Sequence, residues 1–113
     1  MKKDFAEKLE NVVVKILSSE LSRFELPNNF LKVVCDIYPS DYGLNCNITF
    51  VMKKPFSQKE SDVFNNAMAY ALKNRIDKTL GGIFKNNISS QQSTIDSYQK
   101  QKWWYEEKKE NFE

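Results

Sequence analysis

The fold is decided by residues 31–53, LKVVCDIYPSDYGLNCNITFVMK. Apolar side chains recur at every second position on both sides of a Pro-Ser-Asp-Tyr-Gly segment at 39–43. A period of two is typical of strands that bury one face and expose the other, and a short segment of this composition is typical of a turn. We therefore predict a β-hairpin whose strands lie at about 31–38 and 44–53.

Helical patterns flank this hairpin on both sides. Over residues 4–24 the apolar side chains recur every three or four positions, which predicts an amphipathic helix. Residues 57–80 repeat this pattern, and two glycines follow them as a natural helix end. Ser57 and Glu60 have the spacing of a capping box, so we expect the second helix to begin at that serine.

The remainder of the chain is predicted to be a polar loop over residues 83–94 and a C-terminal helix over 95–111. A hairpin of two strands is rarely stable alone. We therefore expect either a short third strand near 83–86, or pairing of an open edge with a second copy or a partner. Residues 1–113 are predicted to form a single α+β domain in helix–hairpin–helix–loop–helix order, with a small antiparallel sheet packed on helices.

The composition argues against an enzyme. The chain has no histidine, so it lacks the commonest general acid–base side chain and the commonest metal ligand. Cys35 and Cys46 have no zinc-ligand spacing. We expect two reduced, buried thiols, and the alternative is a disulfide across the hairpin. Asp36 and Asp41 lie near the turn and are interpreted as solvated carboxylates. We predict no catalytic residue, no metal and no cofactor.

The chain also carries no sign of a membrane segment. No stretch reaches the roughly 18 apolar residues that a membrane helix needs. Charged residues near the N-terminus leave no apolar signal-peptide core. We therefore expect a cytoplasmic protein without membrane contact.

The predicted C-terminal helix carries more aromatic residues than one buried stripe can hold. Four residues can share a stripe that docks the helix: Ile95, Tyr98, Tyr105 and Phe112. Successive helical residues point about 100° apart, so Trp103, Trp104 and Tyr105 cannot all share that stripe. Trp and Tyr are enriched in binding hot spots. We predict a partner-binding surface formed by Tyr98, Trp103, Trp104 and Tyr105; the alternative is a helix that lies in a groove and buries two faces. The flanking charges are interpreted as a solvated face: Lys100, Lys102, Glu106, Glu107, Lys108 and Lys109.

Binding to another protein is therefore the leading hypothesis. In size and lack of motifs the chain resembles immunity and antitoxin proteins, which neutralise a toxin by occlusion. An inhibitor of a nuclease is expected to be acidic, to complement a basic active site. The net charge here is +2, so we expect a target surface that is acidic or mixed.

A basic middle segment supports an alternative hypothesis, nucleic-acid binding. Residues 53–85 carry more basic than acidic side chains, and the basic ones are Lys53, Lys54, Lys59, Lys73, Arg75, Lys78 and Lys85. The helix–strand–strand–helix order with this segment resembles the opening of a KH-type RNA-binding domain, which would imply contacts to RNA. That family clamps RNA with a Gly-x-x-Gly loop, and Gly43, Gly81 and Gly82 do not have that spacing.

Overall fold

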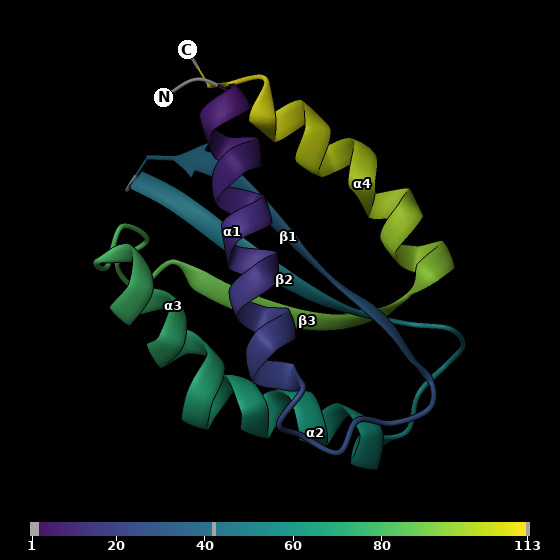
Figure 1. Ribbon diagram of the computed structural model, residues 1–113. Coiled ribbons are helices and arrows are strands. Elements are labelled where there is room, and N and C mark those ends of the chain that lie inside the picture. Colours follow the sequence, from purple (N-terminus) through teal and green to yellow (C-terminus); the bar gives the residue numbers. More distant parts are fainter. Residues whose placement is uncertain (1–2, 42, 113) are drawn as a thin grey trace.

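Two layers of helices enclose a three-stranded sheet in the computed structural model (Figure 1), which describes residues 3–41 and 43–112. The elements are α1 (Lys3–Leu21), β1 (Phe30–Ser40), β2 (Gly43–Met52), α2 (Gln58–Ala67), a π-helical turn η1 (Met68–Leu72), α3 (Lys73–Leu80), β3 (Ile88–Thr94) and α4 (Ile95–Lys109). The predicted α+β class is confirmed. None of the helices in the described part of the chain is both long and apolar enough to cross a membrane.

The sheet has the order β1-β2-β3. β1 and β2 form the predicted antiparallel hairpin, in which Cys35 lies opposite Ile48 and Ile37 lies opposite Cys46. β3 runs parallel to β2 and pairs along its whole length with it. The sheet is therefore mixed and not purely antiparallel. The reason is the connection: the helix between β2 and β3 carries the chain back to the start of β2, as crossovers between parallel strands do.

The third strand does not lie where the sequence placed it. Residues 83–86 form turns, in which the φ angle of Lys85 is 52°. The strand lies instead at Ile88–Thr94, within the segment predicted to be a polar loop. Its serines and glutamines find partners on both sides of the sheet: the Gln92 side chain accepts a 3.0 Å bond from Ser61 on α2, while Gln91 donates a 3.2 Å bond to Thr49. Because its polar side chains are hydrogen-bonded on both faces, β3 can be held in the sheet without alternating apolar residues.

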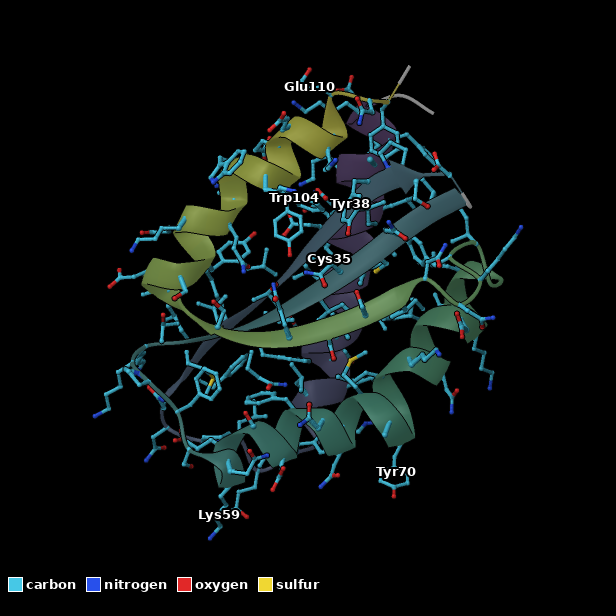
Figure 2. The ribbon with its side chains drawn as sticks, turned by 180° about the vertical axis from the view of Figure 1, so that it is seen from behind. Cys35, Tyr38, Lys59, Tyr70, Trp104 and Glu110 are labelled. Atoms are coloured by element: carbon cyan, nitrogen blue, oxygen red, sulfur yellow. The ribbon has the colours of Figure 1, made fainter. Side chains whose placement is uncertain are left out.

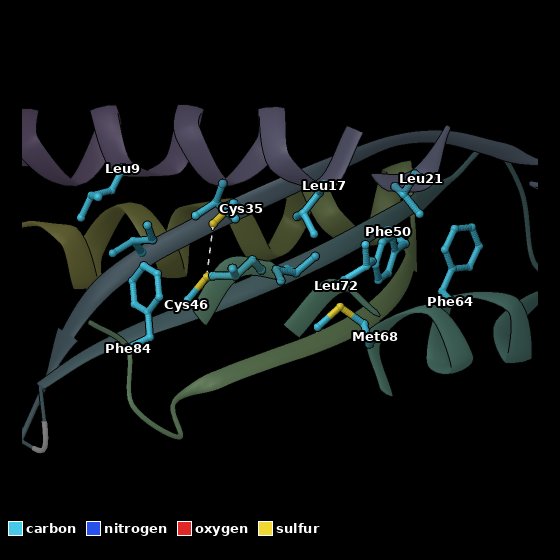
Figure 3. Packing of buried hydrophobic residues seen from close by; sticks show 14 of the residues in the cluster. Leu9, Leu17, Leu21, Cys35, Cys46, Phe50, Phe64, Met68, Leu72 and Phe84 are labelled. Carbon is cyan, nitrogen blue, oxygen red and sulfur yellow. Dashed lines mark hydrogen bonds between the residues drawn. The ribbon is translucent and has the colours of Figure 1, made fainter. Parts of the chain in front are cut away.

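The main core lies between the sheet and the layer of α1 and the α2–η1–α3 helix (Figure 3). Leu17 of α1, Phe50 of β2 and Phe64 of α2 are fully buried there. The rings of Phe50 and Phe64 stack with centroids 4.6 Å apart. Val51, the next residue after Phe50, points to the opposite face and packs under α4 instead. The sheet is thus covered on both faces, with α4 alone on one of them.

The helix boundaries differ from the predicted ones in small ways. α1 ends at Leu21, and α4 ends at Lys109. The predicted capping box is confirmed, because Ser57 and Glu60 bond each other's backbone amides at the start of α2. The helix predicted over 57–80 is interrupted by η1, the usual form of a one-residue insertion in an α-helix. Tyr70 lies on this turn and is 82% exposed.

Candidate partner-binding site on the C-terminal helix

α4 begins on a side-chain cap and docks through part of the predicted stripe. The Thr94 hydroxyl accepts a 3.3 Å bond from the Ser97 amide, which fixes the start of the helix where β3 ends. Tyr98 and Tyr105 are buried under the helix with Ile95 packed beside them, whereas Phe112 lies beyond the end of α4 and is buried in the main core. One face of α4 is therefore committed to the domain, and the opposite face is free to contact something else.

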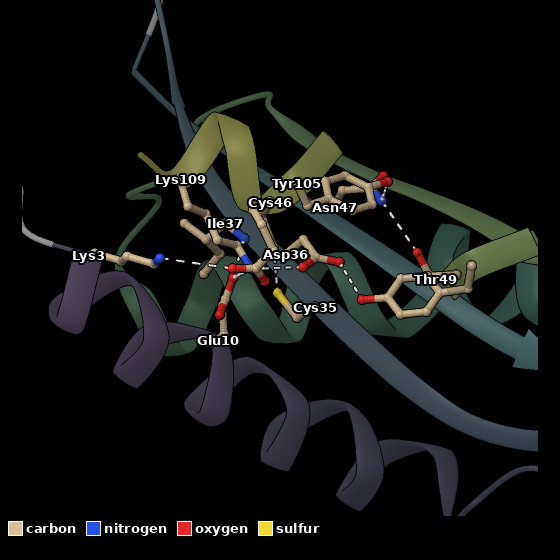
Figure 4. A network of polar contacts seen from close by, with 12 residues as sticks. Lys3, Glu10, Cys35, Asp36, Ile37, Cys46, Asn47, Thr49, Tyr105 and Lys109 are labelled. Carbon is tan, nitrogen blue, oxygen red and sulfur yellow. Dashed lines mark hydrogen bonds and ion pairs between the residues drawn. The ribbon is translucent and has the colours of Figure 1, made fainter. Parts of the chain in front are cut away.

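A buried ion cluster anchors the end of α4 (Figure 4). Lys109 Nζ lies 2.8 Å from a carboxylate oxygen of Glu10 on α1 and 2.8 Å from one of Asp36 on β1. The Tyr98 hydroxyl donates to the second oxygen of Asp36 at 2.9 Å, and the Ile37 amide donates to Glu10 at 2.7 Å. Both carboxylates are thus compensated by several donors, as buried charges need to be.

The cluster shifts the pKa values of its members. Burial alone lowers the pKa of Lys109, but hydrogen bonds to Asp36 and Glu10 outweigh it and hold that pKa above its ordinary value. Burial raises the pKa of Glu10, against the opposing effect of Lys109 and of the Ile37 amide. Burial and the charge of Asp36 together raise the pKa of Tyr98. The cluster therefore favours a protonated lysine and a neutral tyrosine.

Two predictions about charged residues are corrected here. Asp36 is 3% exposed and is not a solvated turn residue, because it points under α4 from the middle of β1. Lys109 is 5% exposed and does not belong to a solvated face. The spacing of the sequence does indicate that Lys109 is buried, because it follows Tyr105 by four residues and so lies on the same helix stripe as Tyr98. A lysine in that stripe needs a buried partner, and no pattern in the sequence identified Glu10 as that partner.

A second polar network fixes the middle of α4. The Asn47 amide donates a 2.6 Å bond to the Tyr105 hydroxyl, and Gln91 donates to the same oxygen at 3.0 Å. Tyr98 and Tyr105 were predicted to form part of the partner-binding surface. They lie inside the domain at 5% and 6% exposure, so their role in this structure is to hold the helix in place.

Trp103 and Trp104 lie on the outer side of α4. Trp103 is 65% exposed and Trp104 is 39% exposed. The Trp104 ring meets Tyr38 of β1 edge-on at 5.3 Å between centroids, and Figure 2 shows these two side chains next to each other. It also meets Tyr105 edge-on at 5.3 Å, and Lys108 Nζ lies 5.2 Å from its centroid. Trp104 is thus held in one orientation, while Trp103 projects further into solvent. We call Tyr38, Trp103 and Trp104 the aromatic patch.

The seven basic residues of the alternative hypothesis are distributed over several elements. Lys53 and Lys54 follow β2, while Lys59 and Lys78 lie near the two ends of the α2–η1–α3 helix, about 28 Å apart along its axis. Arg75 is engaged with Glu20 of α1 at 3.4 Å. The remaining two are Lys73 and Lys85. Lys53 and Lys54 line one hollow with Glu60, and Lys59 lines another with the same glutamate, so three of the seven lie near the start of α2 and Lys78 lies near the end of α3.

The two cysteines are buried next to each other in the core. Their sulfur atoms are 3.6 Å apart and both thiols are free, which confirms the expected buried pair. The hydrogen bond to Cys46 and burial raise the pKa of the Cys35 thiol well above its ordinary value. Within residues 3–41 and 43–112, no three Cys, Asp or Glu side chains are grouped as metal ligands.

Comparisons with known proteins give no match. No protein-family model matches this chain, and no curated protein or solved structure is significantly similar to it. Function is therefore inferred from the site itself, and the site that stands out is the aromatic patch.

Proposed function

We propose that this protein is a non-catalytic binding module that contacts another protein through the aromatic patch. The observation that carries the proposal is the exposure of Trp103 and Trp104, at 65% and 39%, on a helix fixed by buried polar contacts. Large apolar rings left in water are unfavourable, and Trp is the residue type most enriched in binding hot spots. Because Trp104 is already immobilised, little side-chain entropy is lost when a partner covers it.

Within this proposal we place the protein among inhibitors of the immunity or antitoxin type. Such an inhibitor neutralises a toxin by covering its active surface, which requires a preformed contact surface and no chemistry of its own. The exposed indoles on a helix that is held by buried polar contacts support this class. The inhibitor class is tested by cell growth. Expression of the recovered partner alone prevents growth, and co-expression of this protein restores it.

The binding proposal is tested with two alanine variants and a matched control. Trp103→Ala and Trp104→Ala remove the patch, while Tyr70→Ala removes an aromatic side chain that is 82% exposed on the far side of the molecule. A tagged chain captures its partner from lysate of the source organism after nuclease treatment, and the affinity of the purified pair is then measured. We expect each Trp variant to weaken binding by about thirtyfold and the Tyr70 variant to match the wild type.

Two outcomes contradict the proposal. In the first, both Trp variants fold, as judged by circular dichroism, and bind the partner with unchanged affinity. In the second, nuclease treatment removes every partner and nucleic acid is recovered with the untreated protein. The second outcome favours the basic residues of the 53–85 segment, and affinity that falls steeply with salt would then identify phosphate contacts.

A further inference from the structure

Trp104 is flanked by two lysines on the same side of α4. Lys100 precedes it by four residues and Lys108 follows it by four, so the three side chains form one row along the helix. The two ends of the row are about 12 Å apart along the axis. Lys108 Nζ already lies over the indole, 5.2 Å from its centroid. The row therefore presents the Lys100 ammonium beside a flat apolar ring, with the Lys108 ammonium lying over that ring.

Two hollows meet at Trp104. One has a volume of about 350 Å³ and is lined by Lys100, Trp103 and Trp104, together with two neighbours on the helix. The other, of about 380 Å³, lies against the hairpin turn and is lined by Trp104, Lys108 and Tyr38, among others. Trp104 lines both, so the two hollows adjoin at its ring. A segment that crosses Trp104 therefore meets Lys100 in one hollow and Lys108 in the other.

The acidic residues of this end of the chain mostly face elsewhere. Glu106 and Glu110 lie 3.9 and 2.9 Å from Lys3 on α1, on the side of the helix away from the row. Glu107 stands next to Trp103 by helical spacing, and Asp41 lines the hollow at the hairpin turn. Asp96 precedes Lys100 by four residues and so lies at the end of the row. Of these five carboxylates only Asp41 lines either hollow beside Trp104, so the two hollows are lined by two lysines and one carboxylate.

We propose that the partner segment which binds here is acidic, with one carboxylate on each side of an apolar side chain. The apolar side chain rests on Trp104, and the carboxylates reach Lys100 and Lys108. The inference rests on the proposed function and adds the chemistry of the partner. In an extended segment, residues four apart are separated by about 13 Å, which matches the lysine row. A Glu-x-Leu-x-Glu segment therefore fits this surface, and charge complementarity of this kind governs specificity and association rate.

The first test uses the chain's own fluorescence. Trp103 and Trp104 are its only tryptophans, so tryptophan emission reports directly on the patch. The probes are two synthetic peptides without tryptophan, Gly-Ser-Glu-Ser-Leu-Ser-Glu-Ser-Gly and the same sequence with both glutamates replaced by lysine. We expect the acidic peptide to change the emission in a saturable way that added salt suppresses, and the basic peptide to have no effect. An equal response to both peptides, or no response to either, overturns the inference.

The second test uses charge reversal on the captured partner. Lys100→Glu and Lys108→Glu are compared with Lys102→Glu, an exposed lysine of the same helix that lies outside the row. We expect each of the first two to weaken binding by about tenfold or more, mainly through slower association, and the control to stay within about twofold.

The outcomes separate this inference from the proposed function. If Trp104→Ala abolishes partner binding while both row reversals leave it within about twofold, the binding role stands and the acidic partner is wrong. If Trp103→Ala and Trp104→Ala both leave partner binding intact, the proposed function falls, and the peptide titration alone decides whether the row prefers acidic segments.

Discussion

Cys35 and Cys46 are close, with sulfur atoms 3.6 Å apart, and are not joined by a disulfide. They occupy diagonal positions on neighbouring antiparallel strands, since Cys35 is opposite Ile48 and Cys46 is opposite Ile37. Diagonal neighbours have Cα atoms about 7–8 Å apart, whereas disulfides join Cα atoms up to about 6.8 Å apart. The 3.6 Å contact between the sulfurs is therefore that of two thiols, one of which donates its hydrogen to the other.

At the residue scale we predict that neither thiol reacts in the folded protein. Both are buried, and the raised pKa of Cys35 disfavours the thiolate that attacks thiol reagents. The release of a coloured thiolate from an aromatic disulfide reagent measures this: we expect no reaction in buffer and reaction of both thiols in urea. Ser19→Cys, on the exposed side of α1, provides a control that reacts at once. If oxidised glutathione converts the two thiols of the folded wild type into a disulfide, with a loss of two hydrogens, the prediction is wrong.

α4 differs from the other helices in how it is attached. The apolar cluster beneath it contains Val51, Tyr98 and Tyr105, and is much smaller than the cluster on the other face of the sheet. Its position depends on directed polar contacts, above all those of Lys109 with Glu10 and Asp36. Directed contacts define one orientation of a helix more sharply than apolar contact does. The orientation of the aromatic patch follows from them.

At the element scale we predict that Lys109→Met destabilises the fold strongly. Methionine keeps most of the volume but leaves Glu10 and Asp36 as buried carboxylates without a cation. Removing one partner of a buried ion cluster costs about 3–5 kcal/mol. Urea unfolding of the variant and of the wild type measures the difference in the free energy of unfolding. Lys102→Met, at an exposed position, is the control, and we expect it to change that free energy by less than about 0.5 kcal/mol. A loss below about 1 kcal/mol for Lys109→Met would show that the cluster does not hold the helix.

The elements also differ in how far the sequence predicts them. The hairpin and α1 follow from apolar periods of two and of about 3.6 residues, because each buries one apolar face. β3 has no such period: Gln91 and Gln92 point to opposite faces and bond to α4 and α2, and neither contact has a local signal. The exposure of at least one indole on α4 followed from helix geometry alone. The burial of Lys109 did not, because its partners come from α1 and β1, far away in the sequence.

At the scale of the whole molecule, α1 and α4 meet beyond the outer edge of β1. They approach at the end of the molecule where both chain termini lie (Figure 1), and Lys3 bonds Glu110 there at 2.9 Å. Glu10 accepts the Ile37 amide, which points away from β2, and Pro39 has no amide to offer. This half of the edge is therefore closed to further strands. The two helices and the first strand form one unit around the ion cluster.

The same unit makes the stability of the whole domain sensitive to alkali. Lys109 and Tyr98 have folded pKa values above their ordinary values of 10.5 and 10.0. Below those values both groups are protonated in the folded and the unfolded chain, so the stability they contribute is fully present. As the pH rises further, the unfolded chain loses these protons while the folded chain keeps them. The free energy of unfolding must therefore fall as the pH rises above about 10.

We predict that urea midpoints begin to fall above about pH 9, where the unfolded chain loses the Cys35 proton that the folded chain keeps, and that they fall more steeply above about pH 10. Burial also raises the pKa values of Tyr38 and Tyr105, so Tyr98→Phe removes only the Tyr98 part of this decline, and Lys109→Met removes the Lys109 part. Each variant, although less stable at pH 8, therefore has a shallower slope above pH 10. Tyr70→Phe, at an exposed position, is the control that keeps the wild-type slope. Equal slopes for the wild type and for both variants would mean that the cluster titrates alike in the folded and unfolded chain. In that case α4 would be held by its apolar contacts, and the fixed orientation of Trp104 would need another cause.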